Sequence, residues 1–577
     1  MLKRNPYLIN KAFRSYLIAS ILAAASTSIG VVVDGAVVSH LISPKGFAAI
    51  NLAVPLQQLF VTFHLLFNMG AAMLIAFAIG KGNRSEANGY FFMVVCCDLL
   101  IGLLCLVGGG FFSERIAHLL CSDAELFPLV HDYAKVLSLT GVVYLLLPGL
   151  CVFVRTDGSP RLATMALVVA NITNIILDIL FIKYLDWGIE GASWATSISY
   201  LIGIGVTLIH FRKPFAMLCF CASLKGVSFG RVILMGVPMA LASICMIIRL
   251  LSMNHIVLYY WGAVGMSILS VCFNLLILAN VFVSGTVQAM QPIAGIFKGQ
   301  EDSQGVRIVV NNAFKFLLVC QLVYVSFILV FPSVFSGLFG LNGPDIANEV
   351  NLAIRMAALS FLPFSLIYLL MVVYQLLEEH GLAIFISVAQ SLAAVPVMYL
   401  LARFVSPMVW LSFLIGEGIV FLMILSATVY KRRCDRSLAL LTLLPTGVLD
   451  KSIDFSIKRE MDDFFDSLRY IDSFLMENRL DVTVRNQVNA CCEELILNII
   501  KHGRSDTLKH YIDVRILLFE DKVRILIKDD GIPFDPIRYD EKTGFGLLIV
   551  KNFCKDMEYK YIWGQNMVFL NISNPHT

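Results

Sequence analysis

Residues 419–436 read IVFLMILSATVYKRRCDR, and the composition of the chain changes within this stretch. Before it, long apolar blocks recur along the sequence, and after it a short, partly apolar linker leads into a sequence that is rich in charge. Hydrophobic residues make up 58% of the 577 residues. A soluble globule cannot bury that much apolar surface, so the lipid bilayer is the expected surroundings of most of the chain. The stretch therefore separates a polytopic membrane part from a soluble part.

The membrane part contains about twelve apolar blocks of the length that crosses a bilayer. They cover approximately residues 15–38, 46–70, 91–112, 134–154, 163–184, 191–211, 232–254, 258–285, 313–336, 355–377, 382–402 and 407–430. Lysine and arginine gather before the first block, in alternate loops and after the last block, at Lys431, Arg432 and Arg433. Because positive charge favours the cytoplasmic side, we expect a multi-pass protein of the cell membrane with both termini in the cytoplasm.

The two halves of the membrane part end corresponding blocks with similar turns. Gly80-Lys81-Gly82 follows the second block and Lys298-Gly299-Gln300 follows the eighth. Such offsets predict two six-helix lobes, at approximately 1–215 and 225–436, related by an axis along the membrane normal. The expected fold is thus an all-α polytopic membrane domain over 1–436, a linker over 437–452 and a soluble domain over 453–577.

Three polar residues inside apolar blocks are the main candidates for ion coupling, namely Asp34, Asn174 and Asp178. A charge deep in the bilayer is costly and is a functional candidate by default. Asn174 and Asp178 are four residues apart and share a helix face. A carboxylate beside an amide can bind Na⁺ through oxygens or hold a proton. The other interpretation is that these groups only form hydrogen bonds between helices. Further charges lie at Asp98, Arg249 and Glu417, and the sequence leaves their roles open. Asp98 and Glu417 either face a water-filled crevice or lie near an interface, and Arg249 either pairs with a carboxylate or meets an anionic substrate.

Together with the motifs around them, these residues resemble the multidrug and toxic-compound extrusion (MATE) family. The resemblance rests on Asp34-Gly35, Gly80-Lys81-Gly82, Asp157-Gly158-Ser159-Pro160, residues 174–178, residues 188–196, Gly236-Val237-Pro238 and residues 288–292. It implies an antiporter that exports small organic, often cationic, compounds in exchange for Na⁺ or H⁺. By the same resemblance, Asp34, Asn174 and Asp178 form the cation site of the first lobe. The first block lacks the family's usual proline. The seventh and eighth blocks have no acidic residue, so a second-lobe cation site has no support.

The soluble part alternates between helical and strand patterns. Helices are expected over 457–477, 484–502 and 546–557. Strands are expected over 511–519, 523–528, 559–563 and 567–572. The predicted fold is an α+β sandwich with the helices on one face of a sheet.

Polar residues and glycines in the soluble part have the spacing of a nucleotide site. Glu494, Asn498 and His502 share one helix face, where a carboxylate can act as general base and an amide oxygen can bind Mg²⁺. Asp529 ends a strand, where it can accept a hydrogen bond from an adenine amino group, and Gly531 lets the base approach. Gly544 and Gly546 open the third helix, whose free N–H groups suit phosphate. Each piece alone is also typical of a solvated helix or a turn, whereas their order predicts a nucleotide site.

This domain resembles the histidine-kinase-like ATP-binding (GHKL) fold shared by gyrase, Hsp90, histidine kinases and MutL, in particular the anti-sigma-factor serine kinases. The matching boxes are residues 494–498, 529–536 and 544–550. The resemblance implies that Glu494 is the base, Asn498 the Mg²⁺ ligand and Asp529 the adenine contact. No phosphoacceptor-histidine helix precedes the domain. The sequence has no G-x-x-x-x-G-K-[ST] loop, which disfavours an ATP-driven pump of the ABC type.

Two classes of function fit both parts of the chain. The favoured hypothesis is a secondary antiporter whose cytosolic ATP-binding domain regulates transport or a cytosolic partner protein. The alternative is a membrane-anchored sensor kinase that uses the transporter-like part to sense a ligand and phosphorylates a protein on serine or threonine. ATPase and kinase activity both stay open, as does a tail that binds ATP without functional hydrolysis. Nothing in the chain indicates nucleic-acid binding.

Overall fold

The computed structural model describes residues 2–42, 44–121, 123–222, 224, 226–339, 341, 346–446, 451–503, 511–537, 545–554 and 556–574. The chain forms two compact units. The membrane unit comprises residues 16–302 and 309–446, and the soluble unit comprises residues 1–15, 303–308 and 447–577.

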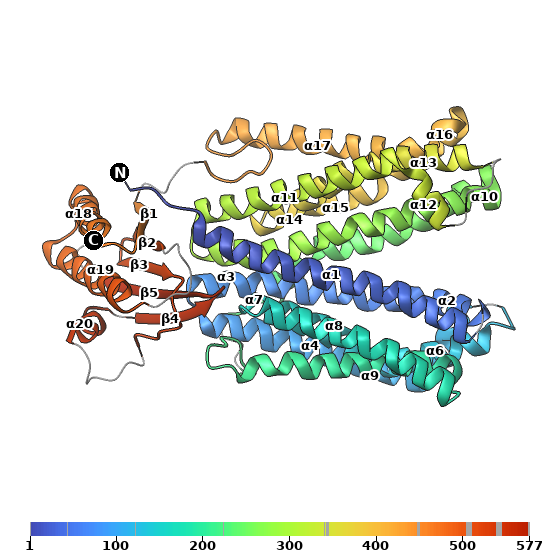
Figure 1. Ribbon diagram of the computed structural model, residues 1–577, viewed down its shortest axis with the longest axis horizontal. Coiled ribbons are helices and arrows are strands. Elements are labelled where there is room, and N and C mark those ends of the chain that lie inside the picture. Colours follow the sequence, from blue (N-terminus) through green and yellow to red (C-terminus); the bar gives the residue numbers. More distant parts are fainter. Residues whose placement is uncertain are drawn as a thin grey trace. The chain divides into compact units, whose positions relative to one another are not determined.

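The membrane unit is a bundle of helices (Figure 1). Its first half contains α1 (Tyr7–Leu41), α2 (Pro44–Phe63), the π-helical η1 (His64–Met69), α3 (Gly70–Lys81), α4 (Arg84–Phe111), α5 (Ser113–Leu120), α6 (Phe127–Leu139), α7 (Gly141–Thr156), α8 (Pro160–Asp178), the π-helical η2 (Ile179–Tyr184), α9 (Gly188–Leu208) and η3 (Ile209–Arg212). Its second half contains α10 (Phe229–Gly299), α11 (Ser303–Val330), α12 (Pro332–Leu338), α13 (Ala347–Ala358), α14 (Phe361–Leu376), α15 (His380–Leu392), α16 (Ala394–Phe404), η4 (Ser406–Leu411) and α17 (Ser412–Cys434).

The predicted apolar blocks fall mainly on these helices. Within the described residues, ten helices are long and apolar enough to cross a membrane, or eleven if the bent pair α6 and α7 forms one span. The helix α10 covers the seventh and eighth predicted blocks and leaves helical geometry at Gly262, with φ 59° and ψ −146°. Glycine adopts that conformation readily because it has no Cβ. The chain is therefore a multi-pass membrane protein.

Glycines let α3 and the adjoining η1 approach α10 closely. A Cβ at Gly299 would lie 2.2 Å from the carbonyl oxygen of Phe77 and 3.0 Å from the Cα of Gly80. A Cβ at Gly236 would lie 1.8 Å from the carbonyl oxygen of Leu66. Small residues allow this backbone contact, as is common between membrane helices. Gly80 and Gly299 belong to the two turns that the sequence predicts to be equivalent, and their backbones lie side by side.

The soluble unit combines a five-stranded sheet with three helices. The strands β1 (Ser452–Lys458), β2 (Tyr511–Leu518), β3 (Lys522–Asp529), β4 (Asp556–Ile562) and β5 (Gln565–Ser573) pair antiparallel in the order β1-β2-β3-β5-β4. The helices α18 (Met461–Glu477), α19 (Val482–His502) and α20 (Phe545–Phe553) share one apolar core with the sheet. The predicted α+β fold is confirmed.

Two predicted helix boundaries in this unit are wrong. The helix expected over 457–477 begins at Met461, because residues 452–458 form β1. Ile453, Phe455 and Ile457 of that strand are buried and alternate with less buried residues, which is the period of a strand. The helix expected over 546–557 ends at Phe553, because β4 begins at Asp556 and pairs with β5.

The first residues of the chain belong to the soluble unit. The backbone N–H of Ser456 in β1 donates to the carbonyl oxygen of Lys3 at 3.3 Å. Arg4 forms an ion pair with Asp454 at 2.6 Å. Lys11 forms one with Asp530 at 2.7 Å. In the sequence, Arg4 and Lys11 serve only to predict the orientation in the membrane. In the structure, both also form ion pairs within this unit.

Candidate functional sites

Two carboxyl groups lie together in the membrane unit. Asp178, the last residue of α8, is 0% exposed. Among the described residues, only the carboxyl group of Asp34 lies within hydrogen-bonding reach of it, and no N–H or hydroxyl donor contacts either of its oxygens. It interacts electrostatically with Asp34 of α1, whose Oδ1 also has no partner in the described part of the chain. The π-helical η2 follows Asp178 directly, and such segments are frequent at functional sites. Two neighbouring carboxylates repel each other, so the pair is complementary to a proton or a metal cation.

The third predicted coupling residue lies one turn before Asp178. The Nδ2 of Asn174 donates to the Oγ1 of Thr196 in α9 at 3.2 Å. Asn174, Thr196 and Asp34 all line one cavity of about 940 Å³. The structure therefore places Asn174 beside the carboxyl pair, with its amide nitrogen bonded to a neighbouring helix.

This cavity lies within the membrane unit and receives residues from both halves. The first half contributes Asp34, His64 and Arg155, and the second contributes Gln288 of α10 and Tyr368 of α14. Aromatic and apolar side chains make up much of the remaining wall, including Tyr133, Tyr144 and Tyr200. A mostly apolar cavity of this size with few polar groups suits a small organic molecule.

The other buried charges of the membrane unit form local contacts. The Nδ2 of Asn68 donates to Asp98 at 3.2 Å. The Nε2 of Gln390 donates to Glu417 at 3.1 Å. The guanidinium of Arg249 lies 5.4 Å from the centre of the Phe413 ring. These contacts surround the three charges whose roles the sequence leaves open, and they do not decide between those roles.

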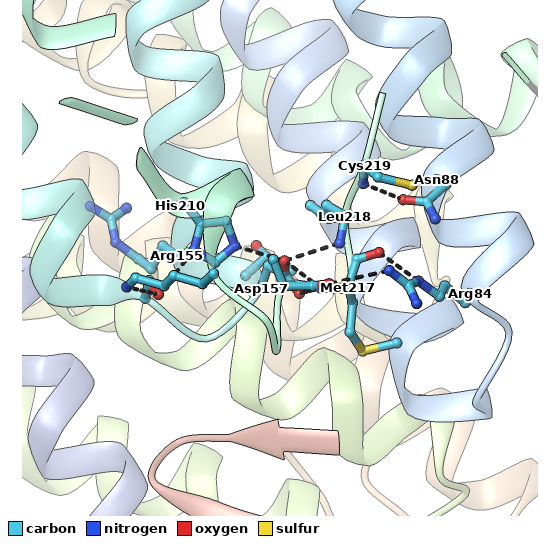
Figure 2. Close-up of polar contacts among 12 residues, drawn as sticks. Arg84, Asn88, Arg155, Asp157, His210, Met217, Leu218 and Cys219 are labelled. Carbon is cyan, nitrogen blue, oxygen red and sulfur yellow. Dashed lines mark hydrogen bonds and ion pairs between the residues drawn. The ribbon is translucent and has the colours of Figure 1, made fainter. Parts of the chain in front are cut away.

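Asp157, which follows α7, binds the backbone of the loop segment that contains Met217 and Leu218 (Figure 2). Its Oδ2 lies 2.7 Å from the Nε2 of His210 and accepts the backbone N–H groups of Met217 at 3.0 Å and Leu218 at 3.1 Å. The Nε of Arg84 donates to the carbonyl oxygen of Met217 at 3.0 Å. The aspartate of the 157–160 motif thus has a structural role that its sequence context does not reveal.

In the soluble unit, the first and third predicted boxes meet. The Nδ2 of Asn498 donates to the Oε1 of Glu494 at 2.7 Å, since both lie on one face of α19. This orientation turns the amide nitrogen toward the carboxylate and leaves the amide oxygen available to a cation. A Cβ at Gly546 of α20 would lie 1.9 Å from the carboxyl carbon of Glu494. Only a glycine lets α20 come this close to the carboxylate.

Asp529 ends β3 and is 7% exposed. Its Oδ1 accepts the backbone N–H of Gly531 at 2.8 Å and the Nδ2 of Asn566 at 3.0 Å. Burial raises the pKa of Asp529, and the bonds from Asn566 and Gly531 partly oppose that rise. The carboxyl group is therefore held in one orientation, with Oδ1 facing two donors.

Asn566 is a site residue that the sequence reasoning missed. It lies opposite Asp529 in the pairing of β3 with β5. Its Oδ1 accepts the N–H of Phe534 at 3.1 Å and the hydroxyl of Tyr559 at 2.7 Å, so it also fixes the loop after Asp529. Only the strand register brings it here, and no local motif indicates it.

For the other residues predicted to bind the nucleotide, the structure gives a position or a burial but no contact with a ligand. His502 is the last residue of α19 and is exposed. Gly531 is buried beside Asp529. Gly544 lies outside the described residues. Their predicted roles in binding a nucleotide stay predictions.

Comparison with protein families identifies both parts of the chain. A family model described as MatE matches residues 19–180 and 238–400, one segment in each predicted lobe. A model described as a histidine kinase-like ATPase domain matches residues 466–572. The first model covers most of the membrane unit, and the second covers the helices and most strands of the soluble unit.

Curated relatives and solved structures agree with this assignment. The multidrug export protein MepA of Staphylococcus saprophyticus is 23% identical over 388 residues, 66% of this chain and 84% of its own. MepA of Staphylococcus haemolyticus is 23% identical over 389 residues, 66% of this chain and 83% of its own. The outward-facing structure of a multidrug resistance MATE transporter is 20% identical with a TM-score of 0.66, over 73% of this chain and 96% of the other. A MOP superfamily transporter from Pyrococcus furiosus is 19% identical with a TM-score of 0.67, over 73% of this chain and 96% of the other.

Proposed function

The chain belongs to the MatE family, and from that premise we propose that it is a cation-coupled antiporter that exports small organic compounds. Its staphylococcal relatives are named multidrug export proteins, and the proposal extends that substrate class to this chain. Exchange is driven by Na⁺ or H⁺ entry. The charge pattern along the loops supports an orientation with both termini in the cytoplasm.

The observation that carries this proposal is the pair Asp34 and Asp178. Asp178 is buried without a hydrogen-bond donor from the described residues, so an ionised carboxylate there needs a cation or a proton. Asp34 interacts with Asp178 and also lines the cavity. A cation bound at the pair changes the charge that Asp34 offers to a substrate. Cation and cationic substrate then compete for one carboxylate, which is the requirement for exchange.

Transport by purified protein in proteoliposomes tests this proposal. The lumen and bath contain no ATP, a Na⁺ or H⁺ gradient is imposed, and tetraphenylphosphonium is the probe. We expect the probe to move against its own gradient under at least one of the two cation gradients. Transport that begins only when ATP is hydrolysed would overturn the proposal.

We further propose that the soluble unit binds Mg²⁺–ATP and regulates the antiporter or a partner protein. Glu494, Asn498 and Asp529 would hold the nucleotide, with Gly546 leaving room beside Glu494. When bound, the nucleotide supplies a polyphosphate charge and a transferable phosphoryl group. Asn498 would present its amide oxygen to the metal, and Glu494 would accept a proton.

A regulatory role has support in the first helix of the chain. Lys11 of α1 forms an ion pair with Asp530, which directly follows the adenine-contact candidate Asp529. The same helix carries Asp34. Occupancy of the nucleotide site can thus act on a residue of the helix that carries a coupling carboxylate.

Titration of full-length protein in lipid nanodiscs with Mg²⁺–ATP tests the second part. We expect saturable binding, and Glu494→Ala separates regulation from kinase activity. Regulation of the antiporter predicts that ATP changes the transport rate of the wild type. Unchanged transport, with ³²P appearing on a serine or threonine of a cytosolic protein only when Glu494 is present, would instead favour the sensor kinase.

A further inference from the structure

Two cysteine side chains face each other between α19 and α20 of the soluble unit. The Sγ atoms of Cys491 and Cys554 lie 4.0 Å apart. Cys491 is in α19 and is 0% exposed, whereas Cys554 directly follows α20 and is partly exposed. Neither cysteine is in a disulfide, and the proposed nucleotide site uses neither thiol. Because an S–S bond is about 2.05 Å long, the two sulfur atoms need to approach by about 2 Å to form one.

Each cysteine lies beside a helix that carries part of the nucleotide site. Cys491 is three residues before Glu494, so the two side chains share a face of α19. Cys554 lies at the opposite end of α20 from Gly546, where a Cβ would be 1.9 Å from the carboxyl carbon of Glu494. The helices α19 and α20 therefore meet at two points, a glycine contact within the nucleotide site and a cysteine contact about two turns away.

The position of Cys554 is tied to that of α20. Its backbone N–H donates to the carbonyl oxygen of Val550 at 3.1 Å, which continues the helical hydrogen bonding past Phe553. Val550 is 0% exposed in the core that α20 shares with α19 and the sheet. On the other side of Cys554, β4 begins at Asp556 and pairs with β5. A displacement of Cys554 toward α19 is thus passed on to α20.

The two thiols differ in access and in reactivity. Cys554 is the one that a small solute reaches, because Cys491 is fully buried. A hydrogen bond from the Cys491 thiol lowers the pKa of Cys554, and burial partly opposes that change. The thiolate is the nucleophilic form of cysteine, so Cys554 is the thiol that reacts first. Cys491 is then in place to attack the oxidised sulfur.

Resting on the proposed function, we propose that Cys554 and Cys491 form a site of reversible oxidation by hydroperoxides, whose disulfide lowers the affinity for Mg²⁺–ATP. The Cys554 thiolate attacks a peroxide oxygen, the O–O bond breaks, and the leaving oxygen takes a proton and departs as water or an alcohol. The Cys491 thiol then displaces the hydroxyl of the Cys554 sulfenic acid as water. Two thiols lose two electrons in total and the peroxide gains them. Disulfides in reducing compartments are usually transient and redox-sensing, which matches a soluble unit in the cytoplasm.

The direction of the effect follows from the glycine contact. No free space separates Gly546 from Glu494, so α20 cannot move closer to α19 at that end. Drawing the sulfur atoms together at the other end therefore tilts α20 about Gly546. The N–H groups of its first turn, which are proposed to bind phosphate, then leave their positions relative to Glu494 and Asn498. We expect the affinity for Mg²⁺–ATP to fall about 10-fold or more.

Oxidation of full-length protein in nanodiscs tests this site. The reduced protein is titrated with Mg²⁺–ATP, treated with a small molar excess of hydrogen peroxide, titrated again, and finally reduced with dithiothreitol. Peptide mass spectrometry identifies the linked cysteines independently of nucleotide binding. We expect a Cys491–Cys554 linkage, weaker binding of Mg²⁺–ATP while it is present, and full recovery after reduction.

Three variants make the assignment specific. Cys554→Ser should form no linkage and keep its affinity in peroxide, whereas Cys491→Ser should accumulate a sulfenic acid on Cys554 that dimedone traps. Cys434→Ser removes an exposed cysteine at the end of α17 and should behave as the wild type does. If the buried substitution Cys491→Ser does not fold, Cys554→Ser and the wild type carry the test.

Three results would overturn the proposal. They are the absence of Cys491–Cys554 linked peptides in the wild type, a linkage that leaves Mg²⁺–ATP affinity unchanged, and an equal loss of affinity in Cys554→Ser. Failure of the reduced wild type to bind Mg²⁺–ATP would instead contradict the proposed function, and the claimed effect on affinity with it. Linked peptides in that case would still establish the oxidation site, so the two failures are distinguishable.

Discussion

Replacing Asp529 with asparagine should invert the base preference of the soluble unit. The Oδ1 of Asp529 faces two donors, the N–H of Gly531 and the Nδ2 of Asn566. An asparagine in the same orientation must place its amide oxygen toward these donors. Its NH₂ group then occupies the position of Oδ2, where the proposed contact with the adenine amino group is made. A hydrogen bond to ATP becomes a contact between two donors.

The size of this effect follows from the cost of an unpaired donor. Leaving a buried hydrogen-bonding group without its partner costs about 1–3 kcal/mol. ATP affinity should therefore fall roughly 5- to 150-fold. Inosine triphosphate carries an oxygen in place of the amino group, so it should bind the Asp529→Asn variant more tightly than ATP and the wild type less tightly than ATP.

The assay is competition of each nucleotide with a fluorescent, ribose-labelled ATP analogue on full-length protein in nanodiscs. Asp521→Asn is the matched control because Asp521 is exposed in the turn between β2 and β3. Its affinities should equal those of the wild type. If Asp529→Asn leaves ATP affinity unchanged, or weakens ATP and inosine triphosphate alike, Asp529 does not read the adenine amino group.

Three further changes test other parts of the structure. Because burial raises the pKa of Asp529, ATP affinity of the wild type should decline as pH falls from about 8 toward 4.5, since protonation removes an acceptor, and pH-dependent titration measures this. Gly546→Ala places a Cβ 1.9 Å from the carboxyl carbon of Glu494 and must displace that group by roughly 1.5 Å. Mg²⁺–ATP affinity should drop about 10-fold or more in the same titration. Asp157→Asn removes the charge beside His210 and should destabilise the membrane unit by roughly 1.5–3 kcal/mol, seen as a lower thermal unfolding temperature.

Each of these changes has a matched control. Asp529→Asn should lose the acid dependence of ATP binding, and a persisting dependence would assign it to another group. Gly418→Ala changes a glycine with nothing within 4 Å of its Cβ position and should leave nucleotide affinity intact. Asp186→Asn alters an exposed aspartate with φ 55°, a conformation that asparagine accepts, and should not change the unfolding temperature. An effect of Asp186→Asn equal to that of Asp157→Asn would contradict the structural role of Asp157.

The membrane fold was predictable because the bilayer sets the length of each apolar block. The sequence does not reveal where such helices depart from regular geometry. The π-helical turns after Phe63 and Asp178 and the break at Gly262 depend on how neighbouring helices pack. In the soluble unit, the alternation of Ile453 and Phe455 carries a strand signal, which the adjoining helical pattern obscured.

In the candidate sites too, a local sequence pattern predicts some features, whereas others depend on the tertiary structure. Glu494 and Asn498 share a helix face, so their proximity follows from the helical repeat alone. Asn566 reaches Asp529 only through the register of two strands, which no local pattern encodes. Arg155 follows an apolar block and has the sequence context of a loop charge. Its burial is determined by tertiary packing.

The initial rate of gradient-driven tetraphenylphosphonium transport in ATP-free proteoliposomes tests the central claim most directly. It is compared for the wild type, Asp178→Asn and Glu494→Ala under the imposed cation gradient that supports wild-type transport. We predict that Asp178→Asn abolishes transport, because the buried carboxylate that binds the cation is lost, while Glu494→Ala transports at the wild-type rate. Wild-type rates in Asp178→Asn, or loss of transport in Glu494→Ala, would contradict a cation-driven antiporter with a regulatory nucleotide domain.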